Sequence, residues 1–239
     1  MDYVNIHLEN PISSLSAANV ASACFDNPDF DTADVLHANA FCSLIHRDPT
    51  TGRVVNDPAN PGLQVGYVNG VEIKYQGIQG TVNYDFPVNM AFLRGRFSLG
   101  GDWLYTLYRE SNITGVAPSP SHGIIGDPAF AGQLRLRYAE NNWGLNTTIN
   151  YVGKQLFSRL NRQQGQPGQG RDARELDHLE DYAIVGAGLF VDPIKKLRLT
   201  FAVNNLFNYQ GMTYRGELVP ASYVDLLGRR YTVSARVRF

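Results

Sequence analysis

Apolar and polar residues alternate along most of the chain with a period of two. In the segment 227–239 the odd positions are almost all apolar, and include Tyr231, Val233 and Val237, whereas the even positions are polar. A β-strand places successive side chains on opposite faces, whereas an α-helix would mix the two sets. The same alternation predicts strands at about residues 2–12, 65–86, 91–109, 130–140, 143–156, 197–207 and 223–239. The segment 180–191 is apolar or small on both faces, and it is predicted as an eighth strand mainly from its position.

The connections between the predicted strands alternate in length. Short turns are expected at residues 87–90, 141–142 and 192–196, and long connections at residues 13–64, 110–129, 157–179 and 208–222. In an up-and-down meander, alternate connections lie at the same end of the sheet, so all long loops fall on one rim. Short turns on one rim, long loops on the other and an apolar outer face are typical of a transmembrane β-barrel. The sequence therefore predicts an all-β, antiparallel, up-and-down transmembrane β-barrel segment.

Composition and charge narrow the function classes. The chain has 239 residues and a formal net charge of −1, which gives no electrostatic case for a nucleic-acid partner. No run approaches the roughly 18–20 apolar residues of a spanning helix. The first residues have neither the basic nor the apolar region of a signal peptide. For a protein outside the cytoplasm, we therefore expect a fragment or an incomplete gene product.

The polar face of the predicted sheet carries an excess of positive charge. Alternation places eight lumen-facing arginines there, namely Arg94, Arg96, Arg135, Arg137, Arg198, Arg230, Arg236 and Arg238. The acids expected on the same side are Glu9, Glu72, Asp85 and Asp102. A closed eight-stranded barrel is only about 16 Å wide, and burying an unpaired charge costs several kcal/mol. The excess favours a wider, wet or plugged lumen, and hence eight strands within a larger barrel.

The end of the chain resembles that of TonB-dependent receptors of the bacterial outer membrane. The residues that carry this likeness form a C-terminal barrel signature: Asn204, Asn205, Leu206 and Phe207 at the end of one strand, Gly228, Arg229, Arg230 and Tyr231 at the start of the last, and the terminal Phe239. The segment around Cys24 and Cys42 also resembles a cysteine-bearing loop of proteobacterial members.

This resemblance implies a fold and a role for the whole chain. Residues 1–239 would supply the last eight strands of a 22-stranded barrel, with the plug domain absent. The implied location is the outer membrane of a Gram-negative bacterium. The implied activity is energy-coupled import of a scarce ligand, such as siderophore-bound iron, cobalamin or an oligosaccharide, with no enzyme activity and no cofactor. The implied partners are outer-membrane lipid, the missing plug and the remaining strands, with the TonB complex reached only through the absent plug. The segment is not expected to transport alone.

Several residues are candidate sites. Cys24 and Cys42 lie in a predicted extracellular loop, where an oxidising environment favours a disulfide; two unpaired thiols are the alternative. The acids between them, Asp26, Asp29, Asp31 and Asp34, lack the glycine and glutamate of an EF-hand, so we expect a solvated loop. The five scattered histidines predict no metal site. Ser119, Ser121 and His122 lack a nucleophile-elbow context, so no catalytic site is expected.

Two questions stay open at this point. The inward arginines could pair with acids of a plug or contact an anionic ligand. The chain could also be a self-contained eight-stranded outer-membrane protein with a structural or adhesive role, or a soluble β-sandwich binding module. The outward apolar faces argue against the sandwich.

Overall fold

The chain forms two compact units built mainly from β-strands. The structure is a computed structural model that describes residues 1–27, 30–31, 33–34, 38–55, 62–116, 118–156, 178–211, 213–214, 217–218 and 227–238. The first unit consists of Met1–Val4, Gly77–Leu107 and His122–Phe239, and the second of Asn5–Gln76 and Tyr108–Ser121.

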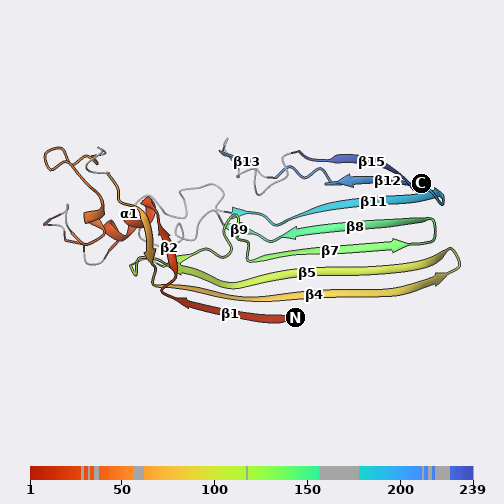
Figure 1. The fold of residues 1–239 in the computed structure, drawn as a ribbon, viewed down its shortest axis with the longest axis horizontal. Helices are drawn as coiled ribbons and strands as arrows, with labels where there is room; N and C mark the ends of the chain where they lie inside the picture. The colour runs from red at the N-terminus through yellow and green to blue at the C-terminus, as the bar shows by residue number, and fades with distance from the viewer. Residues whose placement is uncertain are drawn as a thin grey trace. The chain divides into compact units, whose positions relative to one another are not determined.

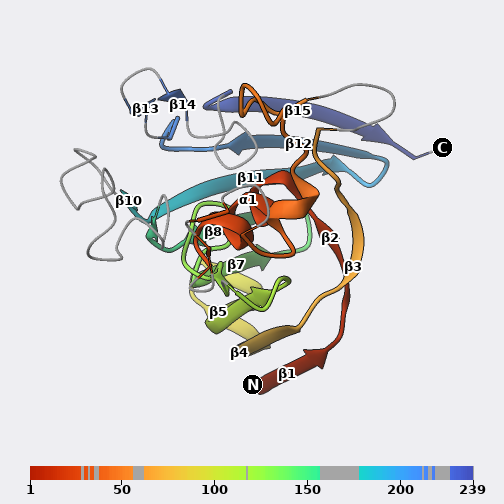
Figure 2. The same cartoon turned by 90° about the vertical axis from the view of Figure 1, so that its left-hand side faces the viewer.

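The principal sheet is an antiparallel meander of long strands. Its order is β1 (Asp2–Glu9), β4 (Glu72–Met90), β5 (Leu93–Asn112), β7 (Phe130–Ala139), β8 (Trp143–Val152), β11 (Tyr182–Ile194), β12 (Leu197–Asn204) and β15 (Arg230–Val237). The short β6 (Ser119–Pro120) pairs with β5 outside this path. Figure 1 shows the long strands running side by side, and Figure 2 shows β7, β8, β11, β12 and β15 following one another in a curved sheet. The order ends at β1 and β15, so the sheet is open.

The predicted eight-stranded meander is confirmed, with corrections to its boundaries. The predicted turn at 87–90 is wrong, because β4 continues to Met90. The alternation of Phe86, Val88 and Met90 continues past Pro87, so these residues extend the strand. The predicted strand 65–86 is instead two elements, since β3 (Gly66–Asn69) is separate and pairs with β2 (Ile12–Leu15).

Cross-strand pairing builds continuous rows of like side chains. One apolar row crosses six strands, through Phe97, Tyr138, Leu145, Leu189, Phe201 and Val233. The adjacent row, one residue along each strand, contains Ser98, Arg137, Asn146, Gly188, Ala202 and Thr232. Because successive residues of a strand point to opposite faces, the sheet has one apolar and one polar face.

In the described part of the first unit, the apolar face of this sheet has no second layer over it. Within the described part of the first unit, Tyr138 and Leu179 are the buried apolar residues, whereas large apolar side chains such as Leu145, Phe201 and Val233 are exposed. A soluble β-sandwich buries one face of each sheet in a shared core. The sandwich alternative therefore fails on the packing of the described residues.

The second unit contains a small disulfide-bonded subdomain. Its helix α1 (Ala17–Phe25) begins at the N-cap Ser16 and buries Val20, Ala23 and Cys24, a spacing that lies on one helical face. The 3₁₀ helix η1 (Cys42–Leu44) packs beside it. None of the helices in the described ranges is long and apolar enough to cross a bilayer.

The described loops of the first unit contain two further short strand pairs. These are β9 (Gln155–Leu156) with β10 (His178–Leu179), and β13 (Thr213–Tyr214) with β14 (Glu217–Leu218).

Candidate functional site

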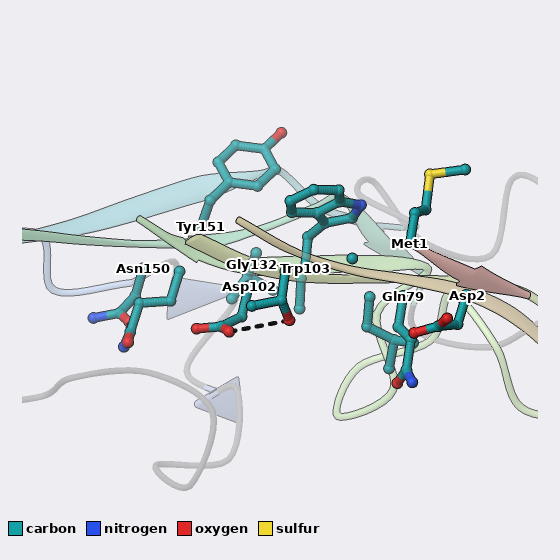
Figure 3. A pocket seen from close by; sticks show the side chains of 14 residues that line it. Met1, Asp2, Gln79, Asp102, Trp103, Gly132, Asn150 and Tyr151 are labelled. Carbon is teal, nitrogen blue, oxygen red and sulfur yellow. Dashed lines mark hydrogen bonds between the residues drawn. The ribbon is translucent and has the colours of Figure 1, made fainter. Parts of the chain in front are cut away.

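The two faces of the sheet differ most clearly around the centre of β5. Figure 3 shows Trp103 and Tyr151 projecting to one side, and Asp102 and Asn150 to the other. On the apolar side the Trp103 ring covers Gly80, because a Cβ built at Gly80 would lie 2.0 Å from that ring. The side chains that line the pocket drawn in Figure 3 therefore point to opposite faces of the sheet, and they enclose no ligand site.

A hydrogen-bonded network occupies the polar side at the same level. The Arg135 guanidinium forms an ion pair with the Asp102 carboxylate at 2.6 Å, and the Thr81 hydroxyl donates to the other Asp102 oxygen at 3.4 Å. Arg135 also donates to the Gln133 amide oxygen, and the Gln133 amide nitrogen donates to Asn150 at 2.7 Å. This network satisfies the one carboxylate of its row, so Asp102 is not free to neutralise other arginines.

A basic hollow of about 360 Å³ lies on the polar side between β7, β8, β11, β12 and β15. This space, which we call the basic hollow, is lined by Arg137, Asn146, Phe190, Arg198, Thr200, Ser234 and Arg236. Arg198 donates two bonds to the Asp192 carboxylate, at 2.7 and 2.6 Å, and its guanidinium lies 4.3 Å from the centre of the Phe190 ring. Guanidinium groups beside amide and hydroxyl donors form an arrangement that attracts anions.

The register places six of the eight predicted arginines on one face of the sheet. Arg96, Arg135, Arg137, Arg198, Arg230 and Arg236 all occupy rows of the polar face. Arg94 and Arg238 lie two residues from Arg96 and Arg236, so the same alternation assigns them to this face. That this face lines a lumen stays a prediction. The sequence did not identify Asn146, Phe190, Asp192, Thr200 or Ser234, because their contacts depend on the pairing register.

The C-terminal signature forms a turn closed by asparagine side chains. Asn205 is 1% exposed and adopts a left-handed φ of 55°, which asparagine tolerates better than most residues. Its amide donates to the Tyr209 carbonyl at 2.6 Å and accepts from the Tyr209 amide at 2.8 Å. Asn208 accepts from the Arg229 backbone amide at 2.9 Å, which ties this turn to the start of β15. Gly228 adopts a φ of 65° at that junction.

The other signature residues have structural positions that differ from one another. Asn204 pairs with Arg230, and Tyr231 pairs with Val203, in the β12–β15 ladder. Phe207 is exposed, and Leu206 donates its backbone amide to Val185. Phe239 lies outside the described residues.

Cys24 and Cys42 form a disulfide bond in the second unit, with their Cα atoms 4.7 Å apart. Both residues are buried. The Asn39 amide nitrogen donates to the Cys24 carbonyl, and its oxygen accepts from the backbone amides of Phe41 and Cys42. This side chain therefore holds the two cysteine-bearing segments together in addition to the covalent bond.

A tight turn follows this subdomain at Asp48. The backbone amides of Thr50 and Thr51 donate to one Asp48 carboxylate oxygen, at 2.8 and 2.7 Å. These bonds hold the pKa of Asp48 below its usual range, and the bond from the Thr51 amide has the larger effect. The side chain therefore supports the loop as a carboxylate.

The remaining candidate residues are the acids, histidines and serines considered from the sequence. In the described part of the chain, no three His, Cys, Asp or Glu side chains gather around a common point that could hold a metal ion. Asp29 and His37 lie outside the described residues. Ser119 belongs to β6, where it pairs with Ser111. His122 is buried at the start of a loop segment that closes through Gly123 and Asp127.

Comparison with protein families identifies the sheet. The model of the family described as TonB dependent receptor-like, beta-barrel, matches residues 10–206. A search of curated proteins gives no match.

Solved structures give the same fold. A mutant of the ferric enterobactin receptor from Pseudomonas aeruginosa is 18% identical, with a TM-score of 0.53 over 99% of this chain. Another mutant of that receptor, in complex with enterobactin, is 19% identical with a TM-score of 0.54. The chain spans 28% of the length of these receptors. At these identities the likeness concerns the fold.

Proposed function

Since the chain belongs to the TonB-dependent receptor β-barrel family, we propose that residues 1–239 form the C-terminal portion of the barrel of a receptor that imports a scarce ligand across the outer membrane. Membership places the chain in the Gram-negative outer membrane, in a family of transporters rather than enzymes. The observation that carries the proposal is the two-faced open sheet, whose apolar rows suit lipid and whose polar rows suit an aqueous interior.

The partners of the proposed receptor follow from the open edges of the sheet. β1 and β15 end the strand order, and an unpaired edge presents free backbone donors and acceptors. In a bilayer these groups must be satisfied by further strands, because no water is present to bond them. We therefore propose additional barrel strands as partners. From the family, we also propose a plug inside the barrel and, through that plug, the TonB complex. The chain then would not transport alone.

Siderophore-bound iron is the ligand class to test first. The similar solved structures are those of ferric enterobactin receptors. Cobalamin and oligosaccharides are the other classes considered. The side chains of the polar face bear guanidinium, amide and hydroxyl groups, which suit a ligand rich in oxygen acceptors.

The test uses cells that produce the complete receptor containing these residues, with and without TonB. Radiolabelled ferric enterobactin, cobalamin and an oligosaccharide are supplied in parallel. We expect TonB-dependent uptake of one of them, with ferric enterobactin first. Uptake of none, together with a heat-modifiable band formed by residues 1–239 alone, would instead establish the self-contained outer-membrane protein.

A further inference from the structure

The basic hollow brings like charges unusually close together. Arg198 and Arg236 are direct cross-strand partners in the β12–β15 ladder. Directly opposed residues have Cβ atoms about 4.5–5.5 Å apart, and like charges in this arrangement are destabilising. Arg137 enters the same hollow from β7, and its cross-strand partner is the neutral Asn146.

Among the described residues, one carboxylate balances these guanidinium groups. Asp192 is bonded by both of its oxygens to Arg198, and Arg238 also acts on it electrostatically. Within the described residues, Arg137 and Arg236 have no acidic side chain within 4.0 Å. Two guanidinium groups therefore face a shared space without a counter-charge.

The remaining lining residues add neutral donors rather than acids. Thr200 and Ser234 are direct partners across β12 and β15 and place hydroxyl groups beside Arg198 and Arg236. Asn146 adds an amide from β8. Phe190 lies under Arg198 and, with Asp192, fixes the orientation of that guanidinium. In the described part of the chain, the hollow thus has two cations without an acidic partner, one held cation and several neutral donors around one space.

We propose that the basic hollow binds an oxyanion, a carboxylate or a phosphate group, between Arg137 and Arg236. Charge-assisted bonds from two guanidinium groups suit the oxygens of either group, and the hydroxyl donors complete the coordination. This proposal rests on the proposed function, since it assumes that the polar face lines the barrel interior. The oxyanion has two possible sources: an acidic side chain of another segment of the same receptor, or a small anion from solution.

The test compares thermal unfolding of the complete receptor in detergent, in sodium phosphate and in sodium chloride of equal ionic strength. The variants are Arg137→Gln, Arg236→Gln and the double substitution. Arg53→Gln, in an exposed loop of the second unit, removes the same charge and is the matched control. Heat-modifiable migration of each variant shows that the barrel has assembled, so a failed oxyanion site is distinguishable from a failed barrel.

If the oxyanion is a small anion from solution, phosphate should raise the Tm of the wild-type and Arg53→Gln receptors. Each substitution of Arg137 or Arg236 should then weaken phosphate binding about tenfold or more. If the oxyanion is an acidic side chain of the receptor, phosphate should have no effect on the Tm. The double variant should then have a lower Tm than Arg53→Gln, because that acidic side chain is left unpaired. Without any bound oxyanion, removing two like charges relieves repulsion. An unchanged or higher Tm for the double variant, with no phosphate effect on the wild type, would therefore overturn the proposal.

Discussion

The assignment of the two faces can be tested by placing the same charge on each of them. Phe201 lies on β12 in the apolar row, between Leu189 and Val233. It is 44% exposed in this chain. A phenylalanine buries about 200 Å², so lipid would cover roughly 90 Å² of it, a contribution of about 2 kcal/mol. An arginine on the lipid face near the middle of the bilayer costs about 2–4 kcal/mol. Phe201→Arg should therefore destabilise the assembled receptor by roughly 4–6 kcal/mol.

The matched control is the next residue along the same strand. Ala202 points to the polar face, where its cross-strand partners are Gly188 and Thr232. Both partners are small, so an arginine at position 202 has room and reaches the aqueous side. We expect Ala202→Arg to change the free energy of unfolding by less than about 1 kcal/mol.

The assay is urea unfolding of the complete receptor in lipid vesicles, with heat-modifiable migration as the measure of assembly. The predicted difference between the two variants is large enough to move the unfolding equilibrium by more than about a hundredfold. Equal destabilisation by both substitutions would refute the two-faced assignment. A greater loss for Ala202→Arg than for Phe201→Arg would mean that the faces are reversed.

Four further predictions concern the loops, the turns and one glycine of β4. Cys24→Ala removes a disulfide that spans 18 residues and should cost about 3 kcal/mol, measured as faster proteolysis of its loop under non-reducing conditions. Because the pKa of Asp48 is lowered, its turn should keep protected amides at neutral pH and lose them as the pH falls below about 4, measured by hydrogen exchange with Asp48→Asn as control. Asn205→Ala should cost about 2–3 kcal/mol in denaturant unfolding, and Asn205→Gly less, since glycine tolerates the positive φ. Gly80→Val should cost about 1–3 kcal/mol by displacing the Trp103 ring, and a Trp103→Ala background should remove that cost.

Alternation was sufficient to predict most of the long strands and their faces, whereas β11 was predicted mainly from its position. The rows through Phe201 and Ala202 depend on nothing more than a period of two along each strand and pairing between successive strands. The short turn after β7 lies close to its predicted place, whereas the turn predicted at 192–196 is shorter, because β11 continues to Ile194. The turn after β4 lies at residues 91–92 rather than at 87–90, because Val88 and Met90 continue the alternation past Pro87.

The long first connection could not be resolved by the same reasoning. β2 and β3 contain four residues each and pair across a gap of about fifty residues, so no local pattern marks them. The side-chain role of Asn39 is equally invisible in the sequence, because its partners lie on both cysteine-bearing segments. The signature turn was recognised by resemblance, but its mechanism, a left-handed Asn205 bonded to Tyr209, required the backbone conformation.

The charge balance of the basic hollow depends on which side chains face each other where β11 ends and β12 begins. Between β11 and β12 the pairing shifts, so that Val191 pairs with Leu199 and Ile194 with Leu197. Two residues of β11, Asp192 and Pro193, therefore face the single residue Arg198, as in a β-bulge. The register that runs to Val191 and Leu199 already places Asp192 opposite Arg198, and the extra residue Pro193 follows it. The Asp192 carboxylate bonds to Arg198, while the regular β12–β15 ladder keeps Arg236 directly opposite Arg198. Asp192 thus neutralises one member of a facing pair of arginines, and the other retains its charge for the proposed oxyanion.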